Sequence, residues 1–488
     1  MKGHHDGDMI TVARRWRARD LEVLWHPCTQ MREHGIGMAK TAQDESAALP
    51  LLTVARGEGA WLIGHDGRRV LDAVSSWWTN LHGHAEPRIA HAIARQTQTL
   101  EQVILAGCTH EPAIELAERL LEIAPRQAGR APLAKVFYAD NGSSGVEVAL
   151  KMAFHWFHNR GEYGRTRFIA LTGSYHGETL GALAVGDLPL YRRVYGSLLP
   201  EALFAPSPDA FGATDPDSAE QRANAAGDAL QRLFESHSGE ICAFILEPLV
   251  QCAGGMRMHH PAYLRRAREL CDAHGIFLIA DEIAVGFGRT GTLFACEQAP
   301  AATANGKPGI QPDLLCLSKG LTGGFLPLCA VLTTQAVYDG FLDDSRERAF
   351  LHSHSYSGNP LACAAALASL RIFENDGVLE RNRATAARMA ELAAPLADHP
   401  LVVEVRQTGM ILAVELSPEP DNNEDGHATE IAGRRGLRMY RAALEHGVLL
   451  RPLGDVLYWM PPYCIDQAQL ALLQCATLAA LEEARRCA

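Results

Sequence analysis

The sequence lacks the spacings that usually mark metal and redox sites. Its 488 residues contain no Cys-x-x-Cys pair among 12 cysteines and no His-Glu-x-x-His among 21 histidines. These absences exclude the usual patterns of zinc hydrolases and redox dithiols, and we expect no metal site. Several cysteines stand inside apolar runs, such as residues 241–246 and 314–317. That placement favours buried, reduced thiols in a cytoplasmic protein over disulfides.

Long apolar runs and an excess of positive charge are also missing. No run reaches membrane-spanning length, and residues 1–20 carry no apolar core of a signal peptide. The net charge is -12, from 57 acidic and 45 basic residues. Nucleic acids and anionic membranes attract basic surfaces, which this composition does not favour. We therefore expect no export, no membrane anchor and no nucleic-acid partner, and we expect small-molecule substrates.

The arrangement of apolar runs predicts an α/β protein with two domains, because the chain is too long for one simple core. Continuous apolar strands alternate with helical periodicity, the pattern of a large domain with a mainly parallel central sheet. From about residue 376 the pattern changes to that of a smaller α+β domain. The predicted division is residues 1–74 as N-terminal arm and part of the small domain, 75–375 as the large domain, and 376–488 as the C-terminal small domain.

Lys319 stands at the end of the apolar run 314–317 and just before glycines. A lysine that leaves a buried strand must reach solvent or find a partner, and most such lysines are solvated. A covalent role is the third option. In a dry pocket the lysine pKa falls, and the amine can form a Schiff base with a carbonyl, which is how pyridoxal phosphate (PLP) is held.

Two other stretches carry the remaining groups that PLP needs. Asp281 ends the apolar run 276–281, and a carboxylate against the pyridine nitrogen keeps the ring protonated. Residues 135–145 indicate a strand, a glycine turn and a helix start, where backbone N–H groups can face a phosphate. Each signal alone is weak, because an Asp after a strand is more often a cap or a turn residue. Together they predict a PLP site at the carboxyl edge of the sheet.

Three further features are candidates for the same pocket. Trp77 and Trp78 lie in a Ser/Gly/His-rich stretch where alternate pointing buries only one ring, so we expect at least one to wall a ligand pocket. Tyr175 follows a strand end and can either stack on a cofactor ring or cap the sheet. Arg451 leaves an apolar strand and can hold a substrate carboxylate as a fork or make an ordinary ion pair.

Residues 139–149, 175–179, 278–291 and the Lys319 segment together resemble the subgroup III (omega) aminotransferases of PLP fold type I. The resemblance extends from about residue 24 to 462. It implies the PLP-dependent transferase fold type I, pyridoxal 5'-phosphate as the cofactor, and a homodimer whose active site lies at the subunit interface.

Four further segments are similar to the corresponding segments of family members that act in biotin biosynthesis. They are residues 25–31, 75–78, 254–258 and 459–463. Those members transfer an amino group from S-adenosylmethionine to 8-amino-7-oxononanoate, which gives 7,8-diaminononanoate. One alternative is another omega-aminotransferase that uses lysine, ornithine or GABA-like amines. A more distant alternative is a non-catalytic assembly protein on the same fold.

The resemblance also implies roles residue by residue. Lys319 is the Schiff-base lysine that moves protons, Asp281 the pyridinium partner, and Tyr175 the residue that stacks on the ring. The residues expected to hold PLP are Gly142, Ser143, Tyr175, Asp281, Lys319, His354 and Ser355, the last two acting from the neighbouring subunit. Those expected to contact substrate are Trp77, Tyr175, Lys319, Ser353 and Arg451. Cys28 stands where several relatives have a tyrosine and is left out.

Overall fold

The computed structural model describes residues 2–34, 49–299, 309–418 and 435–486, with side chains described from residue 9 onward. The chain folds into two compact units, each with its own sheets. Unit 1 comprises Met1–Glu86, Ala386–Arg406 and Ile411–Ala488, and unit 2 comprises Pro87–Thr385 and Gln407–Met410. The three-part division at residues 74/75 and 375/376 stays a prediction.

A seven-stranded sheet forms the centre of unit 2. Its order is β4-β12-β11-β10-β7-β5-β6. Neighbouring strands are parallel from β11 to β6, and only β12 runs antiparallel to its neighbours β11 and β4. The strands are β4 (Leu133–Ala139), β5 (Arg167–Leu171), β6 (Leu203–Ala205), β7 (Ile241–Leu246), β10 (Phe277–Asp281), β11 (Leu314–Leu317) and β12 (Cys329–Thr334). The predicted α/β fold with a mainly parallel sheet is confirmed.

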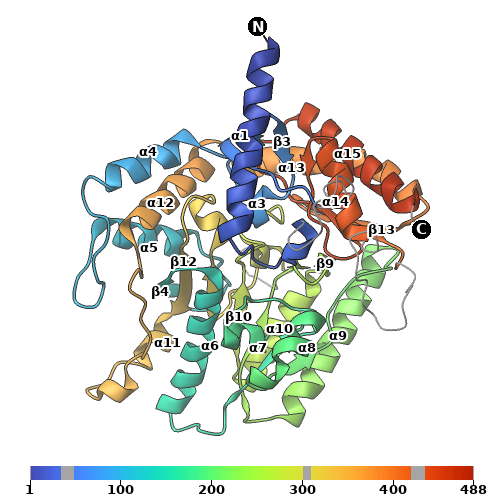
Figure 1. Ribbon diagram of the computed structural model, residues 1–488. Helices are drawn as coiled ribbons and strands as arrows, with labels where there is room; N and C mark the ends of the chain where they lie inside the picture. Colours follow the sequence, from blue (N-terminus) through green and yellow to red (C-terminus); the bar gives the residue numbers. More distant parts are fainter. Residues whose placement is uncertain (1, 35–48, 300–308, 419–434, 487–488) are drawn as a thin grey trace. The chain divides into compact units, whose positions relative to one another are not determined.

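Helix α6 (Gly142–Asn159) packs across this sheet, against β4, β7, β10, β11 and β12 (Figure 1). Its buried face carries Val146, Leu150, Ala153 and Phe157, which recur at helical spacing and join the main apolar core. Asn141 caps the helix, since its side chain accepts the N–H of Ser144 at 3.0 Å. Apolar burial and the cap together place the first turn of α6 at the end of β4.

The other helices of unit 2 pack in two groups. Helices α4 and α5 both contact α12, and α9 packs against α10 (Figure 1). Helix α10 ends at His274 and is capped by Gly275, which adopts the left-handed conformation that glycine tolerates; β10 begins two residues after Gly275. The helices are α4 (Pro87–Gln96), α5 (Glu111–Ile123), α7 (Leu180–Ala184), α8 (Pro189–Tyr195), α9 (Pro216–Ser236), α10 (Ala262–His274), α11 (Gln335–Asp339) and α12 (Pro360–Asn375).

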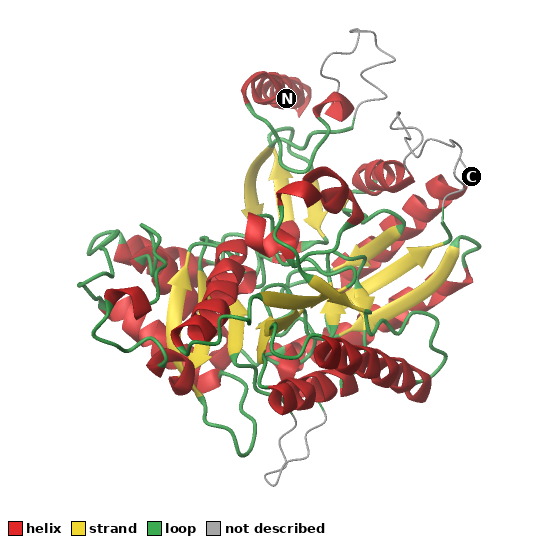
Figure 2. Ribbon diagram, turned by 90° about the horizontal axis from the view of Figure 1, so that it is seen from below, coloured by secondary structure: helices red, strands yellow, loops and turns green. Residues whose placement is uncertain are grey.

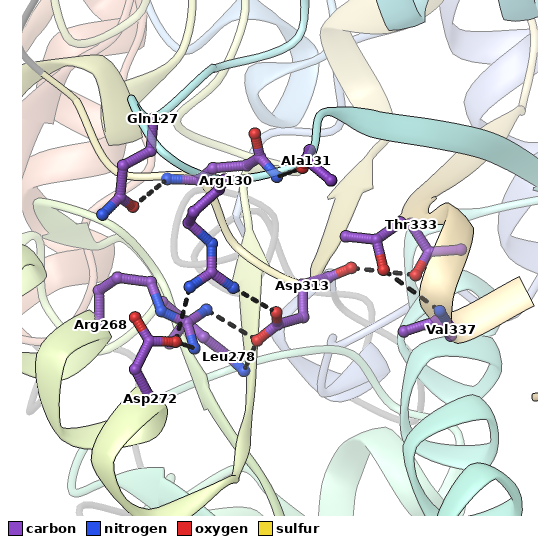
Figure 3. Close-up of polar contacts among 11 residues, drawn as sticks. Gln127, Arg130, Ala131, Arg268, Asp272, Leu278, Asp313, Thr333 and Val337 are labelled. Carbon is purple, nitrogen blue, oxygen red and sulfur yellow. Dashed lines mark hydrogen bonds and ion pairs between the residues drawn. The ribbon is translucent and has the colours of Figure 1, made fainter.

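A partly buried ion-pair network closes the amino ends of β10 and β11 (Figure 3). The Asp313 carboxylate lies 2.8 Å from Arg130 and 2.7 Å from Arg268, and it also accepts the backbone N–H of Leu278. Asp272 bridges the same two arginines at 2.6 and 2.8 Å. The network lies at the opposite end of these strands from Asp281 and Lys319, so its role is to fix the sheet.

Unit 1 contains two small sheets, ordered β1-β2-β3-β15 and β13-β14-β16, drawn in yellow in Figure 2. Strands β1 to β3 are antiparallel and form a meander. The strands are β1 (Val54–Glu58), β2 (Trp61–Gly64), β3 (Arg69–Asp72), β13 (Val402–Thr408), β14 (Ile411–Leu416), β15 (Val448–Leu449) and β16 (Val456–Trp459). The helices are α1 (Lys2–Val23), α3 (Ser75–Trp78), α14 (Arg435–Glu445) and α15 (Gln467–Arg486); α13 (Val378–Ala393) begins in unit 2.

The beginning of the predicted N-terminal arm forms helix α1. Across the described ranges, no helix combines the length and the apolar character needed to cross a membrane.

Candidate active site

The structure places Asp281 and Lys319 at the same edge of the unit 2 sheet. Strands β10 and β11 are parallel, and Asp281 pairs in register with Cys316, three residues before Lys319. Carboxyl ends of parallel strands meet at one edge, where α/β proteins bind their ligands. That both side chains bind one PLP at this edge stays a prediction.

Lys319 stands in a strained and largely desolvated position. Its φ of 41° lies in the left-handed region, an uncommon conformation for a lysine that surrounding structure must enforce. The preceding Ser318 is held by a 2.7 Å hydrogen bond from its hydroxyl to the carbonyl of Leu328. Burial lowers the pKa of the Lys319 ammonium, and the Asp281 carboxylate opposes that shift. A lowered pKa is what a lysine nucleophile requires.

Asp281 is held by a histidine that the sequence reasoning did not single out. Nδ1 of His176 lies 2.7 Å from Oδ2 of Asp281, and Oδ1 accepts the backbone N–H of Ile283 at 3.1 Å. Both side chains are buried, and Nε2 of His176 has no hydrogen-bond partner among the described residues. His176 directly follows Tyr175 in the chain, but the sequence does not show that its side chain is buried or that it meets Asp281. The contact fixes the Asp281 carboxylate in one orientation.

A second acid, Glu247, lies behind Tyr175 and was also missed. One carboxylate oxygen of Glu247 accepts the backbone N–H of Tyr175 at 3.1 Å, and the other accepts that of Cys252 at 3.0 Å. Burial raises the pKa of Glu247 to about 7, while His176 lowers it and Asp281 raises it. The only local signal was the Glu-Pro step that ends β7. The Tyr175 hydroxyl itself donates to Glu178 at 3.1 Å.

The predicted phosphate loop lies at the start of α6. Gly142 and Ser143 occupy the first turn, where backbone N–H groups have no carbonyl partner inside the helix. A Cβ on Gly142 would lie 3.0 Å from the side chain of Ile283, so glycine lets the turn approach the loop that follows Asp281. The Ser143 hydroxyl accepts the N–H groups of Glu178 and Thr179 at 3.1 and 3.0 Å. Ser143 therefore joins the loop after Tyr175 to the phosphate turn.

The loop of Ser353, His354 and Ser355 is exposed and lies beside the same turn. Nε2 of His354 is 3.5 Å from Oδ2 of Asp140, and Nδ1 accepts the N–H of Tyr356. The carbonyl of Ser355 accepts a hydrogen bond from the Gln102 side chain. Within one chain, the loop thus contacts the residue two positions before Gly142.

The predicted substrate residues Trp77 and Arg451 both belong to unit 1, where they form a pair. The Arg451 guanidinium lies over the Trp77 ring at 5.5 Å, a cation–π distance. Trp77 is 43 % exposed, whereas Trp78 is buried and donates to the Tyr458 hydroxyl at 3.2 Å. The two tryptophans therefore divide into one buried and one exposed ring. Cys28 is exposed with a φ of 50°.

Comparison with known proteins identifies the family. Residues 42–480 match the family model described as aminotransferase class-III. Relatives described as adenosylmethionine-8-amino-7-oxononanoate aminotransferase occur in Nitratidesulfovibrio vulgaris, 43 % identical over 94 % of this chain and 80 % of the relative, and in Geobacter sulfurreducens, 42 % identical over 93 % and 94 %. The chain is a class-III aminotransferase.

Solved structures agree with this family membership. The adenosylmethionine-8-amino-7-oxononanoate aminotransferase of Methanocaldococcus jannaschii shares 34 % identity with a TM-score of 0.82 and covers 96 % of this chain and 99 % of that one. An omega transaminase of Pseudomonas jessenii in complex with PMP shares 28 % identity with a TM-score of 0.83, over 96 % and 98 %. This aminotransferase is PLP-dependent, as its family is.

The residues of unit 2 fit that cofactor. A desolvated lysine, a buried carboxylate oriented by a histidine and a helix start with a glycine turn provide an amine, a partner for a ring nitrogen and donors for a phosphate. The carboxyl groups of Glu247 and Asp281 also lie close together in a buried cluster. A cation bound there would stabilise both carboxylates.

Proposed function

We propose that this aminotransferase transfers an amino group from S-adenosylmethionine to 8-amino-7-oxononanoate, giving 7,8-diaminononanoate for biotin biosynthesis. The observation that carries the proposal is the pairing of a desolvated Lys319 with an oriented Asp281 at one sheet edge, in a chain 43 % identical to a relative of that name. The exposed Trp77 beside Arg451 favours a substrate with a long apolar part and a carboxylate.

Each proposed catalytic residue has a role that follows from its surroundings. When bound, PLP supplies an electron sink for the bond broken at the donor carbon. Lys319 would hold the cofactor through its aldehyde, and its amine, once free, would move a proton at the donor carbon, because its lowered pKa lets the amine act as a base. Asp281, oriented by His176, keeps the ring nitrogen protonated.

Other residues bind and orient the cofactor. The N–H groups of Gly142 and Ser143 hold the phosphate, with His354 and Ser355 contributing from the neighbouring subunit of a homodimer. Tyr175 stacks on the ring.

On the substrate side, Trp77 walls the methylene chain, Ser353 contacts the substrate, and Arg451 pairs with the keto-acid carboxylate as a two-donor fork. Both substrates use the same pocket in turn. The enzyme is proposed to act in the cytoplasm.

A competition between donors tests the substrate assignment. Initial rates with S-adenosylmethionine are compared with those for lysine, ornithine and GABA, each with 8-amino-7-oxononanoate as acceptor. Among these four donors, we expect only S-adenosylmethionine to give product. Activity only with the other amines would replace the biotin assignment by a general omega-aminotransferase. Failure of the purified protein to develop a visible absorbance band with PLP would instead favour the non-catalytic alternative.

A further inference from the structure

Glu247 is a buried acid with an unusual set of neighbours. Its residue is 4 % exposed, and both carboxylate oxygens accept backbone N–H groups, from Tyr175 and Cys252. In the turn that follows Glu247, Leu249 adopts a φ of 67°. A hydrogen bond from the N–H of His259 to the Leu249 carbonyl holds this turn in place. Glu247 therefore has one fixed position at the carboxyl end of β7.

The charged neighbours of Glu247 are those of the proposed cofactor site. The groups whose charges act on it are His176 and Asp281, and its own charge acts on Lys319 and on the Cys252 thiol. The ring of His259 also approaches its backbone carbonyl at 3.4 Å. Both Glu247 and Asp281 raise the pKa of Lys319 against the effect of burial. The two acids thus act on the same cation.

We propose that Glu247 is a positioning residue for the cofactor. By accepting the N–H of Tyr175, it fixes the peptide whose side chain stacks on the ring. Its negative charge supplements that of Asp281 and favours the protonated state of the lysine-bound cofactor. This inference rests on the proposed roles of Lys319, Asp281 and Tyr175.

The chain provides a matched control in Glu282. It is fully buried, and its two oxygens also accept two backbone N–H groups, from Ala295 and Cys296 at 2.7 and 2.8 Å. Burial raises its pKa to about 7 as well, but the charge named as acting on it is that of Glu297, and its other partners are the hydrogen-bond donors of Ala295 and Cys296. A Glu→Gln change therefore disturbs similar hydrogen bonds at both positions.

The test compares Glu247→Gln with Glu282→Gln in the holoenzyme. The visible absorbance band of lysine-bound PLP is followed across pH, and the PLP dissociation constant is measured on the apoenzyme. Removing a negative charge near a cation lowers the pH at which the cation loses its proton. For Glu247→Gln we expect this midpoint to fall by about one pH unit and the dissociation constant to rise about tenfold. For Glu282→Gln we expect the pH midpoint to shift by less than about 0.3 pH unit.

Equal shifts in the two variants, or no shift in Glu247→Gln, would overturn the inference. Glu247→Asp provides a second readout if the glutamine variant does not fold. It keeps the charge but shortens the side chain, so the midpoint should stay near that of the wild type while PLP affinity and the circular dichroism of the visible band fall. An unchanged affinity and dichroism in Glu247→Asp would exclude the positioning role. A wild-type protein that forms no visible band would instead refute the proposed function.

Discussion

Lys319 is the residue on which the proposed reaction depends most directly, because it both binds the cofactor and moves the proton. Lys319→Ala should abolish the visible band of bound PLP and lower turnover by roughly 10²- to 10⁴-fold, the usual contribution of a positioned acid–base group. Absorbance spectra and steady-state rates measure both effects. Lys135→Ala is the control, since that lysine packs over the Tyr338 ring at 4.5 Å. Retained turnover in Lys319→Ala would refute the mechanism.

Arg451 is the proposed carboxylate partner in unit 1. Arg451→Gln should raise the KM for 8-amino-7-oxononanoate about 10- to 100-fold, because a charged hydrogen bond contributes about 1.5–3 kcal/mol. The chain offers a matched pair in Arg69, which lies over the Trp61 ring at 4.7 Å. Arg69→Gln should leave this KM unchanged. If the two variants behave alike, Arg451 holds no carboxylate.

At the scale of the element, the turn α3 is held in an unfavourable conformation. All four of its residues have positive φ, namely 50° for Ser75, 46° for Ser76, 65° for Trp77 and 71° for Trp78. Each non-glycine residue in this region costs on the order of 1 kcal/mol or more, so neighbouring contacts must stabilise the turn.

Buried Asp72 provides those contacts. Its Oδ2 accepts the Ser76 hydroxyl at 2.7 Å and lies 2.9 Å from Nε2 of His84. Nδ1 of that ring lies 2.8 Å from the Asn80 amide, and the Asn80 side-chain oxygen accepts the N–H of Gly83. The chain of bonds ties the loop after the turn back to the end of β3.

Asp72→Asn should loosen the turn and reduce the free energy of unfolding by about 1–3 kcal/mol, because an amide cannot accept all the donors that now meet the carboxylate. Urea denaturation of the apoenzyme measures the change, and the KM for the keto acid should rise as Trp77 loses its orientation. The exposed pair of Arg56 and Glu58 provides the control, so Glu58→Gln should change neither quantity. A stable Asp72→Asn variant with normal KM would show that contacts other than those of Asp72 stabilise the turn α3.

At the scale of the whole molecule, the ion-pair network of Asp313 lies at the amino ends of β10 and β11, whereas Asp281 and Lys319 lie at their carboxyl ends. Asp313→Asn should cost about 3–5 kcal/mol of stability, because it leaves Arg268 buried without a full partner. Denaturation curves measure the loss, and substrate KM values should not change. The exposed pair of Glu115 and Arg371 is the comparison, with less than about 1 kcal/mol expected for Glu115→Gln.

Buried acids also give the apoenzyme an unusual pH dependence. Glu282 has a folded pKa of about 7, raised from the usual 4.5. Between these values the folded chain keeps a proton that the unfolded chain has lost, so stability falls as pH rises, on the order of 3 kcal/mol for this group. Denaturation at about pH 5 and about pH 7.5 should show a smaller decrease in Glu282→Gln than in the wild type. An identical decrease would show that Glu282 keeps a normal pKa.

Local patterns were sufficient to predict the strands next to Lys319 and Asp281 and the residues at the ends of those strands. Lys319 and Asp281 stand at the ends of short apolar runs that are typical of buried strands, so their places at one sheet edge could be predicted without coordinates. His176 and Glu247 could not be found in this way. Their partners Asp281 and Tyr175 stand 105 and 72 residues away in the chain, and no local period relates them.

The sequence by itself determined the order of strands and helices, the acidic composition and the chemical groups available at the edge of the sheet. Only the tertiary structure decided which of the chain's acids are buried, which donors meet them and which residues are held at positive φ. The physical reason is that burial and hydrogen bonding depend on neighbours contributed by distant segments. The pKa values and strain that prepare a site for chemistry therefore arise only when those segments pack together.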